Sequence, residues 1–195
     1  MKTPPNYECL YQKAESQAGY FTSGQAQECG FSWERLSNSV KSDKFKRVER
    51  GIYRLIHFPS SPNEDLFVAL LKTSPRSTLS HQTALSVFGL SDVLPGEIHV
   101  TLPRTASRRR AGIRYHTKSI TEEEITHYEG LRVTTVERTL VDLLEGGFDP
   151  QQLRLAAEQS FDRGLTTPKR LGQALDRRGA TSRKEFETLL GLILK

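Results

Sequence analysis

The apolar residues between positions 6 and 56 first follow a helical period and then an alternating one. A first helix is expected over residues 6–18. A second begins after Thr22, which stands at capping-box spacing from Gln25. Gly30 is expected to end this helix, because glycine readily takes the left-handed conformation that terminates helices.

A third helix is predicted after Ser32, a good N-cap residue. Trp33, Leu36 and Val40 recur at helical spacing and are expected to face the core. The opposite face is polar and charged, and it carries Glu34, Arg35, Asn38 and Ser42, with Lys41 at its margin. Because Arg and Asn can form paired hydrogen bonds with guanine and adenine edges, this face is predicted to read a DNA major groove.

Residues 45–49 and 52–56 are extended and flank a glycine turn, which is typical of a hairpin. Seven basic and two acidic residues lie between Arg35 and Arg54, so the hairpin and the helix before it are strongly basic. This combination predicts a winged helix-turn-helix that contacts phosphates beside the groove. The candidate DNA-binding residues are Gln25, Ser32, Arg35, Asn38, Lys41, Lys46, Arg47 and Arg50. The alternative is that these charges are only a solvated surface.

Prolines 59 and 62 indicate a linker, which predicts a first domain over residues 1–60 and a second over 61–195. In the second domain we expect helices over residues 63–73 and 80–89, strands over 97–102 and 113–117, and four helices after residue 134. The expected fold class is α+β: an N-terminal winged helix-turn-helix domain followed by a mixed α/β C-terminal domain with a small sheet and several helices.

A second basic segment comprises the loop between the two predicted strands and the second of these strands. Its arginines are Arg104, Arg108, Arg109, Arg110 and Arg114. Two interpretations stand equally: a second patch for phosphate or an acidic partner, or a solvated loop. The acidic run at residues 122–124 is close enough in sequence to neutralise it.

Composition fits a globular protein with a polyanionic partner. The 195 residues are 36% hydrophobic and 26% charged, with a formal net charge of +5 and a pI near 9.3. Cys9 and Cys29 lack paired spacing, which predicts free thiols and a reducing cytoplasm. No apolar run is long enough to cross a membrane, so we expect a cytoplasmic protein without membrane contact.

The sequence contains no recognisable catalytic motif. A phosphate-binding loop is missing, and the strand motif of metal-dependent nucleases is broken because Glu97-Ile98-His99 lacks the lysine. His99 and His116 are expected as cross-strand neighbours without a third metal ligand, and Arg138 with Asp142 as a structural ion pair. We therefore expect no enzyme activity, catalytic residue, metal or cofactor. A nuclease with an unrecognised site remains an alternative.

Several motifs together resemble the AbiEi-type antitoxins of type IV (abortive-infection) toxin–antitoxin systems. They are Gly19-Tyr20-Phe21-Thr22, residues 45–55, residues 80–85, Ile98-His99-Val100-Thr101 and residues 130–142. The resemblance implies a DNA-binding repressor that acts on double-stranded DNA of its own promoter, possibly at inverted repeats. It also implies a functional partner, a nucleotidyltransferase-like toxin that the C-terminal domain counters, and leaves open whether the two proteins touch. A protein-interaction module without DNA binding is the remaining alternative.

Overall fold

The computed structural model describes residues 4–90, 95–102 and 110–191, which form two compact units. The first unit holds the described residues up to Pro75 together with Glu129–Leu131, and the second holds the rest. The units therefore do not divide at residue 60, where the sequence predicted a domain boundary, because a helix after the linker packs onto the first unit. Within the described residues no helix combines the length and the apolar character needed to cross a membrane.

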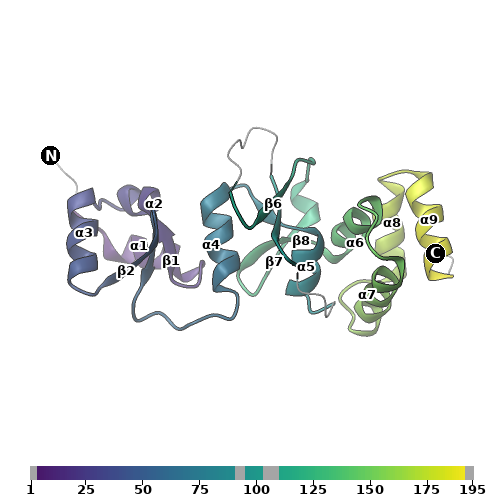
Figure 1. The fold of residues 1–195 in the computed structure, drawn as a ribbon, viewed down its shortest axis with the longest axis horizontal. Coiled ribbons are helices and arrows are strands. Elements are labelled where there is room, and N and C mark those ends of the chain that lie inside the picture. Colours follow the sequence, from purple (N-terminus) through teal and green to yellow (C-terminus); the bar gives the residue numbers. More distant parts are fainter. Residues whose placement is uncertain (1–3, 91–94, 103–109, 192–195) are drawn as a thin grey trace. The chain divides into compact units, whose positions relative to one another are not determined.

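The first unit is a three-helix bundle with a small antiparallel sheet and one further helix (Figure 1). Its elements are α1 (Tyr7–Glu15), β1 (Tyr20–Thr22), α2 (Ser23–Glu28), α3 (Trp33–Lys41), β2 (Phe45–Glu49), β3 (Ile52–Leu55) and α4 (Glu64–Thr73). The sheet order is β1-β3-β2. This arrangement confirms the predicted winged helix-turn-helix and adds β1, a strand of three residues that the sequence did not reveal.

One face of this sheet is covered by α1, α2 and α3. The buried cluster between them contains Leu10, Ala14, Phe21, Ala26, Cys29, Phe31, Leu36, Phe45 and Tyr53. Phe21 meets Phe45 edge to face at 5.0 Å between ring centroids, a favourable aromatic geometry. The prediction that Trp33 belongs to this core is wrong, since its side chain is 62% exposed. Phe31 fills the core at this end of α3 instead.

Cys9 and Cys29 form a disulfide, which overturns the expectation of free thiols. Cys9 lies in α1 and Cys29 is the C-cap of α2. The backbone amide of Asn6 donates to the Cys29 carbonyl at 2.8 Å, so the start of α1 is held against the end of α2. Helix packing brings the cysteines together across 20 residues of sequence, and their spacing alone gave no sign of it.

The other face of the small sheet is covered by α4. The Tyr20 hydroxyl donates to the Glu64 carboxylate at 2.7 Å, and the Arg54 guanidinium lies 3.3 Å from the same carboxylate. These two side chains leave β1 and β3 on the face away from Phe21 and Tyr53. They explain why α4 belongs to the first unit although it follows the proline-rich linker.

The second unit combines a five-stranded sheet with helices. Its elements are β4 (Thr78–Leu79), α5 (His81–Val87), β5 (Ile98–Thr101), β6 (Ile113–His116), η1 (Glu122–Glu124), β7 (Ile125–Tyr128), β8 (Leu131–Thr134), α6 (Val136–Glu145), α7 (Pro150–Asp162), α8 (Pro168–Asp176) and α9 (Ala180–Leu190). The strand order is β6-β5-β4-β8-β7. β4 pairs with β5 antiparallel and with β8 parallel, and β5 pairs with β6 parallel.

The four helices α6 to α9 gather beside one another at the C-terminal end of this unit (Figure 1). Thr135, Asp149 and Thr167 cap α6, α7 and α8 through their side-chain oxygens. The predicted number of helices after residue 134 is confirmed, and so is the α+β class. The last helix begins at Ala180, after Gly179 as its N-cap residue.

Candidate nucleic-acid interface

Helix α3 presents the predicted polar face to solvent. The Ser32 hydroxyl accepts the Arg35 amide at 3.3 Å and so fixes the start of the helix. Leu36 and Ser39 are buried against the core. The remaining charged and polar positions of the helix are exposed, namely Glu34, Arg35, Ser37, Asn38 and Lys41. The N-terminal half of α3 is therefore available to enter a groove.

The β2–β3 hairpin is a short wing whose tip is anchored to the helix pair. Arg50 and Gly51 form the turn, and Gly51 has a φ of 82°, which glycine adopts without strain. The Ser23 amide donates to the Gly51 carbonyl at 2.9 Å, which ties the tip to the first residue of α2. Arg50 is exposed at this fixed tip.

The strand register divides the basic residues of the wing between its two faces. Arg47 pairs with Tyr53, whose ring lies in the core beneath the helices, so Arg47 belongs to the face that carries α3. Lys46 pairs with Arg54, whose side chain lies toward α4. Arg47 therefore lies on the sheet face that the helices cover, and Lys46 lies on the opposite face.

Two other predicted DNA-binding residues, Gln25 and Ser32, already form hydrogen bonds within the fold. The Gln25 side-chain oxygen accepts the Thr22 amide at 2.8 Å, and its amide nitrogen donates to Gln17 at 3.0 Å. The Ser32 hydroxyl caps α3. Both side chains were correctly assigned as caps, and these bonds leave them less free to contact a ligand.

The exposed cations of α3 and of the wing have no acidic partner among the described residues. Arg35, Lys41, Arg47 and Arg50 take part in none of the ion pairs between described residues, whereas Glu49 pairs with Lys72. Unpaired cations on one surface attract phosphates, and binding DNA releases the counterions that surround it. We call the exposed side chains Trp33, Arg35, Asn38, Lys41, Arg47 and Arg50 the α3–wing surface.

The second basic segment lies mostly outside the described residues, since Arg104, Arg108 and Arg109 fall there. Arg110 and Arg114 are described and exposed, and Arg114 stands opposite His99 in the β5–β6 pair. The acidic run does not neutralise the described part of this segment. Glu122 pairs instead with Arg132, and Glu123 pairs with Arg177. Glu124 pairs with both Arg138 and Arg178.

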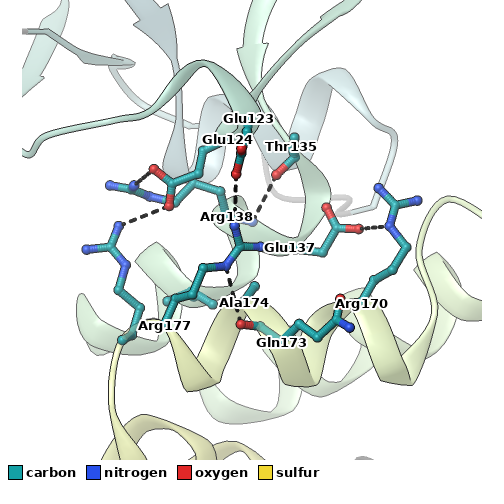
Figure 2. A pocket seen from close by; sticks show the side chains of 11 residues that line it. Glu123, Glu124, Thr135, Glu137, Arg138, Arg170, Gln173, Ala174 and Arg177 are labelled. Atoms are coloured by element: carbon teal, nitrogen blue, oxygen red, sulfur yellow. Dashed lines mark hydrogen bonds and ion pairs between the residues drawn. The ribbon is translucent and has the colours of Figure 1, made fainter.

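A small pocket in the second unit is lined by charged side chains that pair with one another (Figure 2). Arg138 binds Glu124 at 2.7 Å and Asp142 at 2.8 Å, which confirms the predicted Arg138–Asp142 pair. Glu137 accepts Thr166 at 2.6 Å and Arg170 at 2.9 Å. The side chains that line the pocket thus form a network that joins α6 to η1 and α8. Within this network the acidic and basic groups pair with one another.

Three histidines meet in the second unit, where the sequence had indicated only two. His99 and His116 lie across the β5–β6 pair with ring nitrogens 3.1 Å apart, as expected. His81, the first residue of α5, supplies the third ring, which stacks on His116 at 3.6 Å between centroids. One ring nitrogen from each residue lies within 4.8 Å of the others.

Burial keeps all three imidazoles neutral near pH 7. Burial, with the neighbouring histidines next in importance, lowers the pKa of His81 to about 3 and the pKa of His116 to about 4. Burial also lowers the pKa of His99. Neutral imidazoles carry one free lone pair each, the form in which histidine binds metals.

Comparison with known proteins gives two family matches and a likeness of fold to a solved structure. Residues 10–56 match the family described as "Transcriptional regulator, AbiEi antitoxin", and residues 77–192 match "AbiEi antitoxin C-terminal domain". No curated protein sequence matches the chain. The crystal structure of the RV2827C protein from Mycobacterium tuberculosis is similar, with a TM-score of 0.56 and 15% identity over 93% of this chain and 74% of that chain. At this identity the likeness concerns the fold alone.

Proposed function

We propose, given that this chain belongs to the AbiEi antitoxin family, that it is the antitoxin of a type IV toxin–antitoxin system and represses its own operon. The first unit binds double-stranded promoter DNA through the α3–wing surface. The second unit counters a nucleotidyltransferase-like toxin encoded beside it. These activities operate in the cytoplasm, where promoter and toxin are both found.

The observation that carries the DNA-binding proposal is the pairing of an exposed α3 with unpaired cations on the wing. Arg35 and Asn38 are exposed on α3 and have the hydrogen-bonding groups that distinguish guanine and adenine. Arg47 and Arg50 are exposed on the wing, where arginine can contact phosphate without regard to sequence. The surface thus combines base recognition with phosphate binding in the manner of winged helices.

Mobility shifts on the protein's own promoter test this assignment. Arg35→Ala and Asn38→Ala are expected to cost about 1–3 kcal/mol each at the specific site and little on unrelated DNA. Arg50→Ala is expected to weaken all DNA similarly and to flatten the salt dependence by about one unit. Lys169→Ala, which removes an exposed charge from α8, is the matched control and should bind as the wild type does. If Arg35→Ala, Asn38→Ala and Arg50→Ala all bind like this control, the α3–wing surface is not the DNA-binding site.

Toxin neutralisation is tested separately by growth of cells that express the adjacent toxin gene. Full-length protein should restore growth, and Arg35→Ala should restore it as well while losing repression of a promoter fusion. This split is expected because Arg35 belongs to the first unit and the second unit carries the antitoxin C-terminal match. Failure of the wild type to restore growth would reject the antitoxin role and leave the repressor role standing.

A further inference from the structure

We propose that His81, His99 and His116 form a binding site for a divalent transition metal, with Zn²⁺ the best fit. The proposal goes beyond DNA binding and toxin neutralisation, and it concerns only the second unit. It rests on the convergence of three histidine ring nitrogens from three different elements, α5, β5 and β6. Three histidines with one open position form a familiar zinc environment.

The distances between the nitrogens are close to those that a tetrahedral ion requires. Two nitrogens bound to one Zn²⁺ at about 2.0–2.1 Å lie roughly 3.4 Å apart. His99 Nδ1 and His116 Nε2 are already 3.1 Å apart, and all three ring nitrogens fall within 4.8 Å of one another. A contraction of this group by about an ångström would complete the three-nitrogen side of the site.

The hydrogen bonds behind the rings hold them in place, as the outer partners of metal-bound histidines do. His81 Nδ1 lies 3.0 Å from the Ser80 hydroxyl, which leaves Nε2 to bind the ion. The Thr101 hydroxyl donates to the same Ser80 oxygen at 2.7 Å, and the His99 amide donates to Thr83 at 2.8 Å. These bonds link the start of α5 to β5, so two of the histidines are positioned by one network.

The backbone at His81 gives independent support for a functional role. Its φ is 51°, a left-handed conformation that costs free energy for any residue except glycine. Ala18, Asp43 and Glu129 also have a positive φ among the described residues, and of these four residues His81 is the one that begins a helix. Strained backbone of this kind concentrates at functional sites, because the surrounding structure must hold it there.

Besides this contraction, binding needs two adjustments. One nitrogen of the His99–His116 hydrogen bond carries a proton, which must move to the other nitrogen of its ring. The second adjustment is a turn of one ring. The His81 and His116 rings are nearly parallel, with 13° between their planes, whereas two ligands of one ion both aim a nitrogen at it. Rotation about the bond between Cβ and the ring corrects this, and for histidine that rotation is soft. The half-exposed His116 is the ring with room to turn.

Calorimetric titration of chelator-treated, tag-free full-length protein with ZnCl₂ tests the site. One ion per chain is expected, Co²⁺ should give the visible absorption of a tetrahedral nitrogen site, and Mg²⁺ should not bind because it prefers oxygen ligands. His116→Gln is expected to weaken Zn²⁺ binding about tenfold or more, since even partners behind the ligands contribute that much. His127→Gln, at an exposed histidine of β7, should bind as the wild type does.

Three outcomes would overturn the proposal. Wild-type protein that binds neither Zn²⁺ nor Co²⁺ would show a hydrogen-bonded histidine cluster without a metal. Unchanged Zn²⁺ affinity in His116→Gln would place the ion at another site. Reduced Cys9 and Cys29, which this variant retains, are an example of such a site. Equal losses in His116→Gln and His127→Gln would indicate surface binding. Circular dichroism confirms that each variant is folded, and no arm of the experiment involves DNA or toxin.

Discussion

Lys46 lies directly opposite Arg54 in the β2–β3 pair, on the face of the wing that α4 covers. Its neighbour Arg47 lies opposite Tyr53 and shares a face with α3. Two adjacent cations of equal charge therefore serve different surfaces. We expect Arg47→Ala to weaken promoter binding and to lower the salt slope by about one unit, whereas Lys46→Ala should do neither.

Filter binding over a series of salt concentrations measures both effects. Lys46→Ala is the control for Arg47→Ala, because both changes remove one positive charge from the same strand. If Lys46→Ala lowers the slope as much as Arg47→Ala does, the DNA does not distinguish the two faces of the wing. In that case the long-range charge of the unit, rather than the α3–wing surface, governs binding.

Trp33 is the only tryptophan of the chain, and its side chain is 62% exposed at the start of α3. Residues at the N-terminus of a recognition helix contact base edges, so promoter DNA should remove this ring from water. Its fluorescence emission is expected to change on titration with promoter DNA. The Trp33→Ala protein should bind more weakly while its unfolding free energy changes by no more than about 0.5 kcal/mol, as is usual for exposed sites.

The contradicting results are equally clear. A tryptophan spectrum that is insensitive to saturating promoter DNA would mean that α3 stays in solvent in the complex. A large loss of stability in Trp33→Ala would mean instead that the ring has a packing role despite its exposure. Competing DNA of unrelated sequence provides the control for non-specific quenching.

Local rules predicted most of the elements, because the signals that begin helices are short and act on the next turn. The side chains of Thr22 and Ser32 both accept the backbone amide three residues on, as their positions in the sequence indicated. Thr134 and Thr135 both have a side chain that can cap α6, and in the structure Thr135 does so. The short strands β1 and β4 escaped notice since they contain only three and two residues.

The relationships that sequence reasoning missed are those that only tertiary packing creates. His81 precedes His99 by 18 positions and no spacing rule joins a helix start to a strand, so the third histidine had no local signal. The faces of Lys46 and Arg47 depend on the ladder register and on the irregularity between Arg47 and Glu49. The basic side chains of α3 were identified in advance because helical periodicity alone decides which of them are exposed.

The Cys9–Cys29 disulfide closes a loop across a sequence separation of 20, and we expect it to stabilise the first unit. A cross-link of this length raises the free energy of unfolding by about 3 kcal/mol through its effect on the unfolded chain. Reduction, or the Cys9→Ala/Cys29→Ala double change, should lower the urea midpoint for the first unit. The double variant should no longer respond to reductant, which separates loss of the bond from other effects of the reagent. Identical midpoints for oxidised and reduced wild type would show that helix packing alone stabilises the unit.

Tyr20 and Glu64 should make the stability of the first unit depend on pH at both extremes. Burial, with the hydrogen bond to Glu64 next in importance, raises the pKa of Tyr20 to about 12 from 10.0. The folded protein holds the Tyr20 proton more tightly than the unfolded chain does, because the pKa is higher in the folded state. The resulting contribution to stability is complete below the unfolded pKa of 10.0 and is lost as the pH rises toward 12. This change in pKa corresponds to a contribution of roughly 3 kcal/mol.

The opposite sign applies to the carboxylate. The hydrogen bond from Tyr20 lowers the pKa of Glu64 below 4.5, so its contribution is present above that value and is lost as the pH falls. Urea unfolding at a series of pH values measures both limbs. Tyr20→Phe should be less stable than the wild type at pH 7, and the gap between the two should shrink above pH 10 because only the wild type loses the contribution there. Curves that stay a constant distance apart from pH 9 to pH 12 would show that the Tyr20 hydroxyl does not couple the sheet to α4.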